Sequence, residues 1–124
     1  MVSRALSKTE ADLVRWLLRR DFPGVQVLRD QVPLTEVSGT WTPGSASLNL
    51  EVEAAAERSS FPDGPVPGEV WAYSPGGAPI GTVLLWVHNG ALSGIEYGWV
   101  SEEQPSDVPA VSSLVDCAIG DRGA

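Results

Sequence analysis

The spacing of apolar residues near the start of the chain is helical. Four of them recur at intervals that place them in one stripe of a helix, with arginines on the opposite side: Leu13, Val14, Leu17 and Leu18. Just before this stripe, Ser7 and Glu10 form a capping-box pattern, in which each side chain can bond to the backbone N–H of the other residue. We therefore expect a helix over residues 7–20.

Residues 24–32 allow two interpretations. The preceding sequence Asp21-Phe22-Pro23-Gly24 ends the first helix and suits the start of another one. Val25, Leu28, Gln31 and Val32 are then spaced for one face of a short second helix. The alternation of Val25 and Val27 fits a strand equally well, so both interpretations stay open.

After Pro33 the period changes to the alternation of half-buried strands, which is clearest in residues 46–53. We expect about five strands, near 34–41, 46–53, 69–74, 80–88 and 91–100. Residues 54–68 have no periodicity and include three prolines, which indicates a surface loop. The predicted fold is one α+β domain over residues 1–124, with one or two N-terminal helices packed on a mainly antiparallel sheet of about five strands. Sequential hairpins favour a meander, and residues 1–5 and 120–124 are expected to be frayed.

The dipeptide Asn89-Gly90 is the strongest short signal for a hairpin, because a type I′ turn needs positive φ at both central residues. Regular alternation from this turn predicts four facing pairs: Val87 with Leu92, Leu84 with Ile95, Thr82 with Tyr97, and Ile80 with Trp99. One face of the hairpin is then expected to pack under the first helix, and it carries Ile80, Leu84, Ile95 and Trp99.

The opposite face of this hairpin is more apolar than a solvent-facing sheet normally is. It is expected to carry Val83, Leu85, Val87, Leu92 and Glu96. Either the C-terminal tail covers this face or a partner does. Within the tail, residues 111–119 are apolar enough to dock, as a weak helix, after an acidic loop that contains prolines.

The net charge of −8 is unevenly distributed along the 124 residues. Residues 1–32 carry six basic and four acidic side chains, whereas residues 33–124 carry two basic and twelve acidic ones. An acidic surface repels phosphate backbones, so we expect no nucleic-acid partner, and it favours encounter with a basic protein. The alternative is that the charge serves solubility alone.

Composition also bears on the compartment. No apolar stretch of signal-peptide length follows the N-terminus, and the longest apolar run, residues 83–87, is far shorter than a membrane-spanning helix. We expect a cytoplasmic protein that does not bind membranes. Cys117 is the only cysteine, which excludes an internal disulfide, and we expect it to be a small buried residue.

Patterns for catalysis or metal binding are not evident. A nucleophilic Ser or Cys usually needs a nearby histidine, and the one histidine, His88, adjoins the hairpin turn, where a solvated or structural role is expected. One His and one Cys cannot supply the ligand spacings of zinc sites, and no phosphate-binding glycine pattern is present. We expect no catalytic residue, no metal and no cofactor.

Carboxylates and aromatic residues remain as candidates for binding. The candidate partner-binding residues are Glu51, Glu53, Glu96, Glu102, Glu103, Leu85 and Leu92. The five carboxylates could share one face if strand 46–53 lies near the last hairpin, and the two leucines would add apolar area. Five tryptophans are many for this length, and Trp71, Trp86 and Trp99 fall in the last three strands, where they suit either core packing or an interface.

Two segments of the chain resemble a family of small actinobacterial proteins. They are Asp21-Phe22-Pro23-Gly24 followed by Leu28-Arg29-Asp30-Gln31, and the sequence NGALSGIEYGW over residues 89–99 followed by Glu102-Glu103-Gln104-Pro105. Some members have cysteines just before the strand that begins near Leu48, but this chain has Thr40 to Ser45 there, so the resemblance implies no metal. The family lends no activity. The expected build is also similar to that of small bacterial immunity proteins.

These observations favour a non-catalytic protein-binding module, an acidic immunity-like or regulatory partner of a basic protein. A small-molecule-binding protein that uses sheet aromatics is the alternative, followed by a carboxylate-dependent enzyme. A deep apolar pocket with convergent polar groups would favour the small molecule, whereas a broad acidic face would favour the protein partner.

Overall fold

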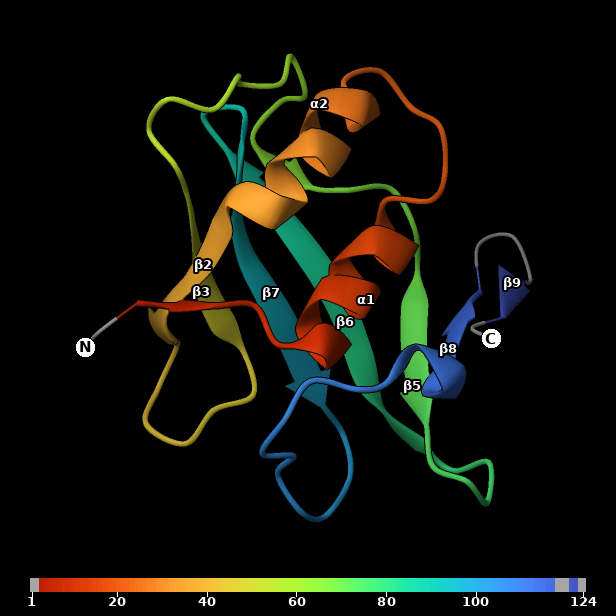
Figure 1. Ribbon diagram of the computed structural model, residues 1–124. Coiled ribbons are helices and arrows are strands. Elements are labelled where there is room, and N and C mark those ends of the chain that lie inside the picture. The colour runs from red at the N-terminus through yellow and green to blue at the C-terminus, as the bar shows by residue number, and fades with distance from the viewer. Residues whose placement is uncertain (1–2, 118–120, 123–124) are drawn as a thin grey trace.

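A curved sheet with two helices on one of its faces forms the fold in the computed structural model, which describes residues 3–117 and 121–122 (Figure 1). The helices are α1 (Lys8–Leu17) and α2 (Val25–Gln31), and two 3-10 helices are η1 (Val32–Leu34) and η2 (Val111–Ser113). The strands are β1 (Arg4–Ala5), β2 (Thr35–Thr40), β3 (Leu48–Val52), β4 (Gly64–Pro65), β5 (Val70–Tyr73), β6 (Pro79–His88), β7 (Ala91–Trp99), β8 (Leu114–Asp116) and β9 (Asp121–Arg122).

The α+β class is confirmed, and every pairing between the described strands is antiparallel. In the part of the chain that the structure describes, the sheet has nine strands instead of about five. The additional strands β1, β4, β8 and β9 are only two or three residues long, too short to show a period in the sequence. Two of them lie in segments that we expected to be frayed, and β4 lies in the expected surface loop.

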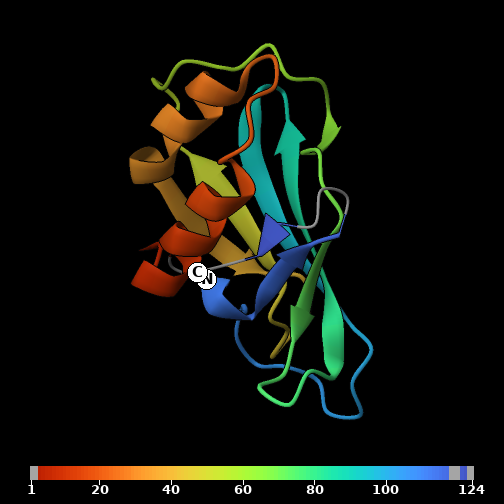
Figure 2. The same cartoon turned by 90° about the vertical axis from the view of Figure 1, so that its right-hand side faces the viewer.

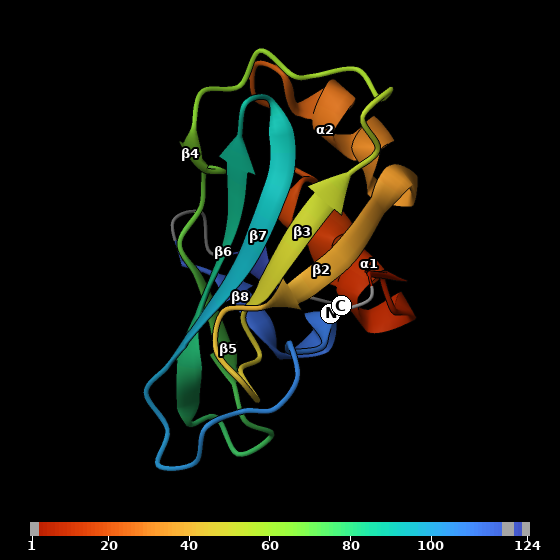
Figure 3. The same ribbon diagram turned by 90° about the vertical axis from the view of Figure 1, so that its left-hand side faces the viewer.

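The strands do not form a simple meander. Their order is β1-β2-β3-β7-β6-β5-β8-β9, and β4 pairs with β6 along the same edge as β5. After β3 the chain crosses the end of the sheet and returns on the far side of the β6–β7 hairpin (Figure 3). As a result β3 pairs with β7, so the expected meander is wrong at the connection over residues 54–68.

The β6–β7 hairpin turns at Asn89-Gly90 as predicted, with φ of 51° and 74° at these residues. Val87 pairs with Leu92 as expected, but the next pair is Trp86 with Gly94. Ser93 is therefore an extra residue in β7, a β-bulge. Beyond the bulge the predicted pairs are shifted by one residue, so that Leu84 pairs with Glu96, Leu85 with Ile95 and Val83 with Tyr97.

The bulge also reverses the predicted faces of β6. Val83, Leu85 and Val87 lie in the core, whereas Leu84 and Trp86 lie on the opposite face. Leu92 and Ile95 are three residues apart and both point inward, because the bulge interrupts the alternation of β7. Trp99, expected in the core, is 44% exposed at the end of β7.

Helix α1 begins with the predicted capping box. Glu10 N donates to Ser7 Oγ at 3.1 Å, and Ser7 N donates to Glu10 Oε1 at 2.8 Å. Arg4 of β1 donates two further bonds to the Glu10 carboxylate, both of 2.8 Å. These bonds from Arg4 are the main reason why the pKa of Glu10 lies below its ordinary value.

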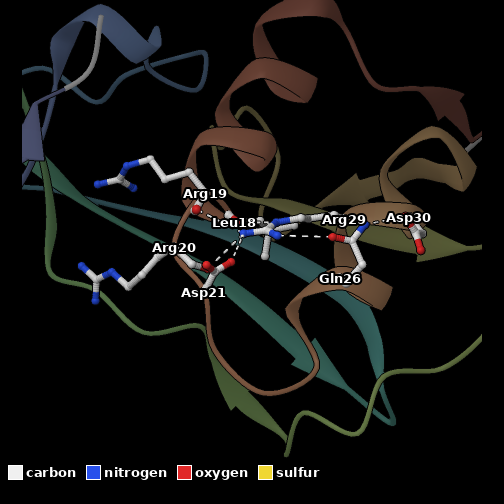
Figure 4. Close-up of polar contacts among 7 residues, drawn as sticks. All are labelled: Leu18, Arg19, Arg20, Asp21, Gln26, Arg29 and Asp30. Atoms are coloured by element: carbon white, nitrogen blue, oxygen red, sulfur yellow. Dashed lines mark hydrogen bonds and ion pairs between the residues drawn. The ribbon is translucent and has the colours of Figure 1, made fainter.

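Helix α1 ends at Leu17, three residues before the predicted end, and Arg29 of α2 holds this terminus (Figure 4). The Arg29 guanidinium donates to the carbonyl oxygens of Leu18, Arg19 and Arg20 at 2.8, 3.1 and 3.3 Å. The carbonyl of the C-cap residue Leu18 has no intrahelical donor, so this side chain satisfies it together with two carbonyls of the turn that follows the helix. Residues 24–32 are thus largely helical, and Arg29 ties α2 to α1.

Both helices cover the same face of the sheet (Figure 2). The apolar stripe predicted for the first helix is buried there, and its members have exposures of 4% or less: Leu13, Val14, Leu17 and Leu18. The sheet contributes Leu48, Leu50, Val52, Val70, Val83, Leu85, Val87, Leu92, Ile95 and Tyr97 to this core. Burial raises the pKa of the Tyr97 hydroxyl.

Gln31 connects α2 to the β6–β7 hairpin and is 1% exposed. Its Nε2 donates to the carbonyl oxygens of Glu57 and Gly90 at 2.9 and 2.8 Å, and its Oε1 accepts from Leu92 N at 3.0 Å. Backbone groups beside a bulge lack regular ladder partners, so the buried carboxamide takes the place of a neighbouring strand.

The C-terminal tail joins the sheet edge instead of covering the open face. The expected weak helix over 111–119 is wrong for residues 114–116, which form β8 against β5, while Ile119 lies outside the described residues. Asp116 is 1% exposed and accepts from Glu69 N at 3.2 Å and from Arg20. Cys117, expected to be buried, is exposed.

Candidate functional site

The candidate site is the face of the sheet opposite the helices, which we call the outer face. Figure 3 shows that no helix covers it. Alternation along the strands places the following residues there: Glu36, Asn49, Glu51, Trp71, Thr82, Leu84, Trp86, Gly94, Glu96 and Gly98. Glu36, Asn49 and Glu51 are exposed, and the larger apolar side chains are half-buried.

Strands β2 to β7 contain no Lys or Arg. Glu36 and Glu51 are direct cross-strand neighbours, with Glu36 on β2 and Glu51 on β3. Like charges in facing positions destabilise a sheet, so this pair costs stability when it stands in solvent. The basic side chains of the first 32 residues lie instead in β1, the two helices and the turn between them.

The outer face has a cleft between two tryptophans, which we call the Trp41–Trp86 cleft. Its volume is about 450 Å³, and Asn49, Asp63 and Gly94 also line it. Trp41 follows β2, is 45% exposed, and donates from Nε1 to Leu48 O at 3.2 Å. Trp86 donates from Nε1 to Glu96 Oε1 at 3.0 Å, which fixes its indole beside that carboxylate.

A second hollow of about 570 Å³ lies where the β5–β6 turn meets the start of β8. Its described walls include Tyr73, Ser74, Ser113 and Val115, and no described residue in its lining is Asp, Glu, Lys, Arg or His.

Only part of the predicted acidic face is brought together. Glu51 and Glu53 are exposed at one end of β3, and Glu96 is half-buried on β7. Because Asn49 faces Gly94, Glu51 and Glu96 lie four residues apart along the strands, about 13 Å.

Glu102 and Glu103 are exposed in the loop after β7, at the end of the sheet away from the Asn89-Gly90 turn. They are therefore separated from Glu51 and Glu53. Leu85 and Leu92 are 0% and 1% exposed, so their assignment to a partner surface is wrong.

Three residues of this face were missed from the sequence: Glu36, Trp41 and Asp63. Glu36 stands between Thr35 and Val37, which are both buried, and this alternation is a signal for an outward-facing residue that the sequence shows. Trp41 stands at the start of a Pro-Gly turn, where a large aromatic residue is itself a signal of a candidate binding residue. Asp63 gave no signal, because its contacts come from a segment 25 residues away.

His88 lies beside Asp63 at the hairpin turn. His88 Nδ1 lies 3.0 Å from Asp63 Oδ2, and Asp63 Oδ1 accepts from Asn89 N at 2.9 Å, so Asp63 holds the hairpin turn. Among residues 3–117 and 121–122, no three His, Cys, Asp or Glu side chains gather as a metal site requires. No helix in this described part of the chain is long and apolar enough to cross a bilayer.

Comparison of the chain with models of protein families, with curated proteins and with solved structures gives no match. The outer face is therefore interpreted from its own residues.

Proposed function

We propose that the protein is a non-catalytic binding module whose outer face binds a basic protein, in the manner of an immunity-like or regulatory partner. The observation that carries the proposal is an open sheet face with facing carboxylates, half-buried aromatic and aliphatic side chains, and no Lys or Arg on strands β2 to β7. Charge of one sign steers an oppositely charged partner, and apolar area beside it adds affinity.

The facing pair Glu36 and Glu51 is the most specific part of this surface. Two carboxylates in adjacent cross-strand positions repel each other in the free protein. A cation bound between them would remove this repulsion, so the same arrangement that lowers stability raises affinity for Lys or Arg.

The experiment uses a fluorescein-labelled peptide of alternating arginine and glycine as the probe, with association rates measured at low and physiological salt. The double variant E36Q/E51Q should slow association about threefold to tenfold and weaken its dependence on salt. The matched control is E102Q/E103Q, which changes the net charge equally in the loop after β7. Equal effects of the two variants would show that the peptide responds to net charge alone and would contradict the proposal.

A small-molecule site is the second candidate function, because the Trp41–Trp86 cleft has the volume of a ligand pocket. Binding of an uncharged ligand there, with no response of the basic peptide to the charges of the outer face, would favour it.

A further inference from the structure

The Trp41–Trp86 cleft has a floor without a side chain. Gly94 lies in the same cross-strand row as Asn49 and Trp86, and all three line the cleft. A Cβ placed on Gly94 would lie 3.7 Å from Nε1 of Trp41, which shows that this indole stands beside the glycine. The missing side chain at Gly94 thus lets the Trp41 indole lie against the backbone of β7, in the cross-strand row that also carries Trp86.

The polar atoms around the cleft favour a cation over a neutral or anionic group. Both indole N–H groups are used inside the protein, by Leu48 O and by Glu96, so the rings offer their faces and not their donors. Asp63 and His88, which contact each other, both line the cleft, and the Glu96 carboxylate accepts from Trp86 Nε1. Indole faces and carboxylates both attract cations, and no described residue that lines the cleft is Lys or Arg.

We propose that the Trp41–Trp86 cleft receives an arginine side chain of the basic partner. The inference rests on the proposed function and names the side chain that the outer face recognises. Arginine fits better than lysine because the guanidinium is planar, stacks on indole faces, and is less strongly hydrated than an ammonium group. Its five N–H donors can also reach the carboxylate and carboxamide oxygens at the cleft, including those of Asp63 and Asn49.

Indole N–H signals in a ¹H–¹⁵N NMR spectrum of the full chain provide the direct test, since each of the five tryptophans gives its own signal. The probe is N-acetyl-arginine amide, with N-acetyl-citrulline amide as its uncharged analogue. The signals of Trp41 and Trp86 should move saturably with the arginine probe and not with citrulline. Equal shifts with citrulline, or shifts with the uncharged disaccharide maltose alone, would assign the cleft to a neutral ligand and overturn the inference.

A matched pair of variants separates this inference from the proposed function. W41A should weaken binding of the arginine–glycine peptide about tenfold, whereas W99A should leave it unchanged. Trp99 is the appropriate control because it is 44% exposed, close to the 45% of Trp41, and does not line the cleft.

If the peptide binds and depends on Glu36 and Glu51 but W41A has no effect, the cleft assignment fails and the proposed function stands. If the peptide does not bind the wild-type protein, the proposed function fails. The titration with N-acetyl-arginine amide then decides independently whether the cleft accepts a guanidinium group.

Discussion

Replacement of Gln31 by leucine tests how the helical layer supports the hairpin that carries the outer face. The carboxamide of Gln31 makes three hydrogen bonds in the core, to Glu57 O, Gly90 O and Leu92 N. Leucine has a similar volume but no polar atoms, so Q31L removes the bonds and leaves the shape of the core nearly intact. Gly90 O keeps a second donor, Ser59 N at 2.8 Å, whereas Leu92 N loses the acceptor that Gln31 Oε1 provides.

The expected loss follows from these contacts. Three net hydrogen bonds contribute about 1 kcal/mol each, and a buried amide without an acceptor adds about 1–3 kcal/mol to the cost. The additional apolar burial of leucine offsets about 1 kcal/mol. The free energy of unfolding should therefore fall by about 3–5 kcal/mol, which at a slope of about 1.5 kcal/mol per M corresponds to a decrease of about 2–3 M in the urea midpoint.

Urea denaturation followed by tryptophan fluorescence measures this change, and hydrogen exchange at the Leu92 amide locates it. The control is Q26L, because Gln26 is exposed on the same helix and bonds to Asp30 at 3.0 Å; it should change stability by less than about 0.5 kcal/mol. If Q31L is as stable as Q26L and Leu92 stays protected, the carboxamide is not what holds the hairpin to α2.

Substitutions at three further residues probe the supports of the fold. R29A should lower the free energy of unfolding by about 2 kcal/mol in urea denaturation, and R29K should recover little of this loss, because one ammonium cannot replace the three bonds to Leu18, Arg19 and Arg20. Equal stability of R29A and wild type would refute the role of Arg29 at the end of α1. E10Q should be less stable than wild type at neutral pH. Because the folded pKa of Glu10 is lowered, its stabilising charge is lost as pH falls through that pKa, so the difference in stability should shrink below about pH 4.5. A difference in thermal melts that does not change with pH would contradict this. G90A should lower the free energy of unfolding by about 2 kcal/mol or more in the same melts, because φ is +74° at this residue and a Cβ would lie 2.5 Å from Ser59 O. Retention of the wild-type melting temperature would show that the turn relaxes freely.

Local signals in the sequence predicted local structure well. The Ser7 and Glu10 pair marked the start of α1, and Asn89-Gly90 marked the β6–β7 turn, because each pattern needs contacts only among neighbours. The end of α1 could not be predicted in this way. It depends on Arg29, a residue of the following helix, 11 positions from Leu18.

The error in the faces of the hairpin has a single cause, the bulge at Ser93. Regular alternation from a correct turn put Leu85 and Leu92 on the surface, and one extra residue moved Leu85 into the core. Gly94 was the available signal, since a glycine inside a strand often marks a bulge or a close approach. At this position it marks both, because Trp41 stands beside it.

Contacts between distant segments were beyond the sequence patterns. Asp116 interrupts the apolar run of β8 and would be unfavourable if buried alone. Its partner Arg20 lies 96 residues away at the end of α1, so the reason for this carboxylate is visible only in the folded chain. The pairing of β3 with β7, which places Glu51 and Glu96 on the same face, is likewise a non-local contact.

The topology converts a charge difference along the chain into one across the molecule. The basic N-terminal segment forms the helical layer, while the acidic remainder forms the sheet, whose outer face has no Lys or Arg on β2 to β7. Arg4, Arg20 and Arg29 are engaged by Glu10, Asp116 and helix carbonyls, so these cations stabilise the helical layer. Glu36 and Glu51 instead face each other in solvent, an arrangement that disfavours the free sheet. A surface that is destabilised by its own charge in the free protein gains most from a cationic partner, which supports the proposal that the outer face, and not the helices, binds a basic protein.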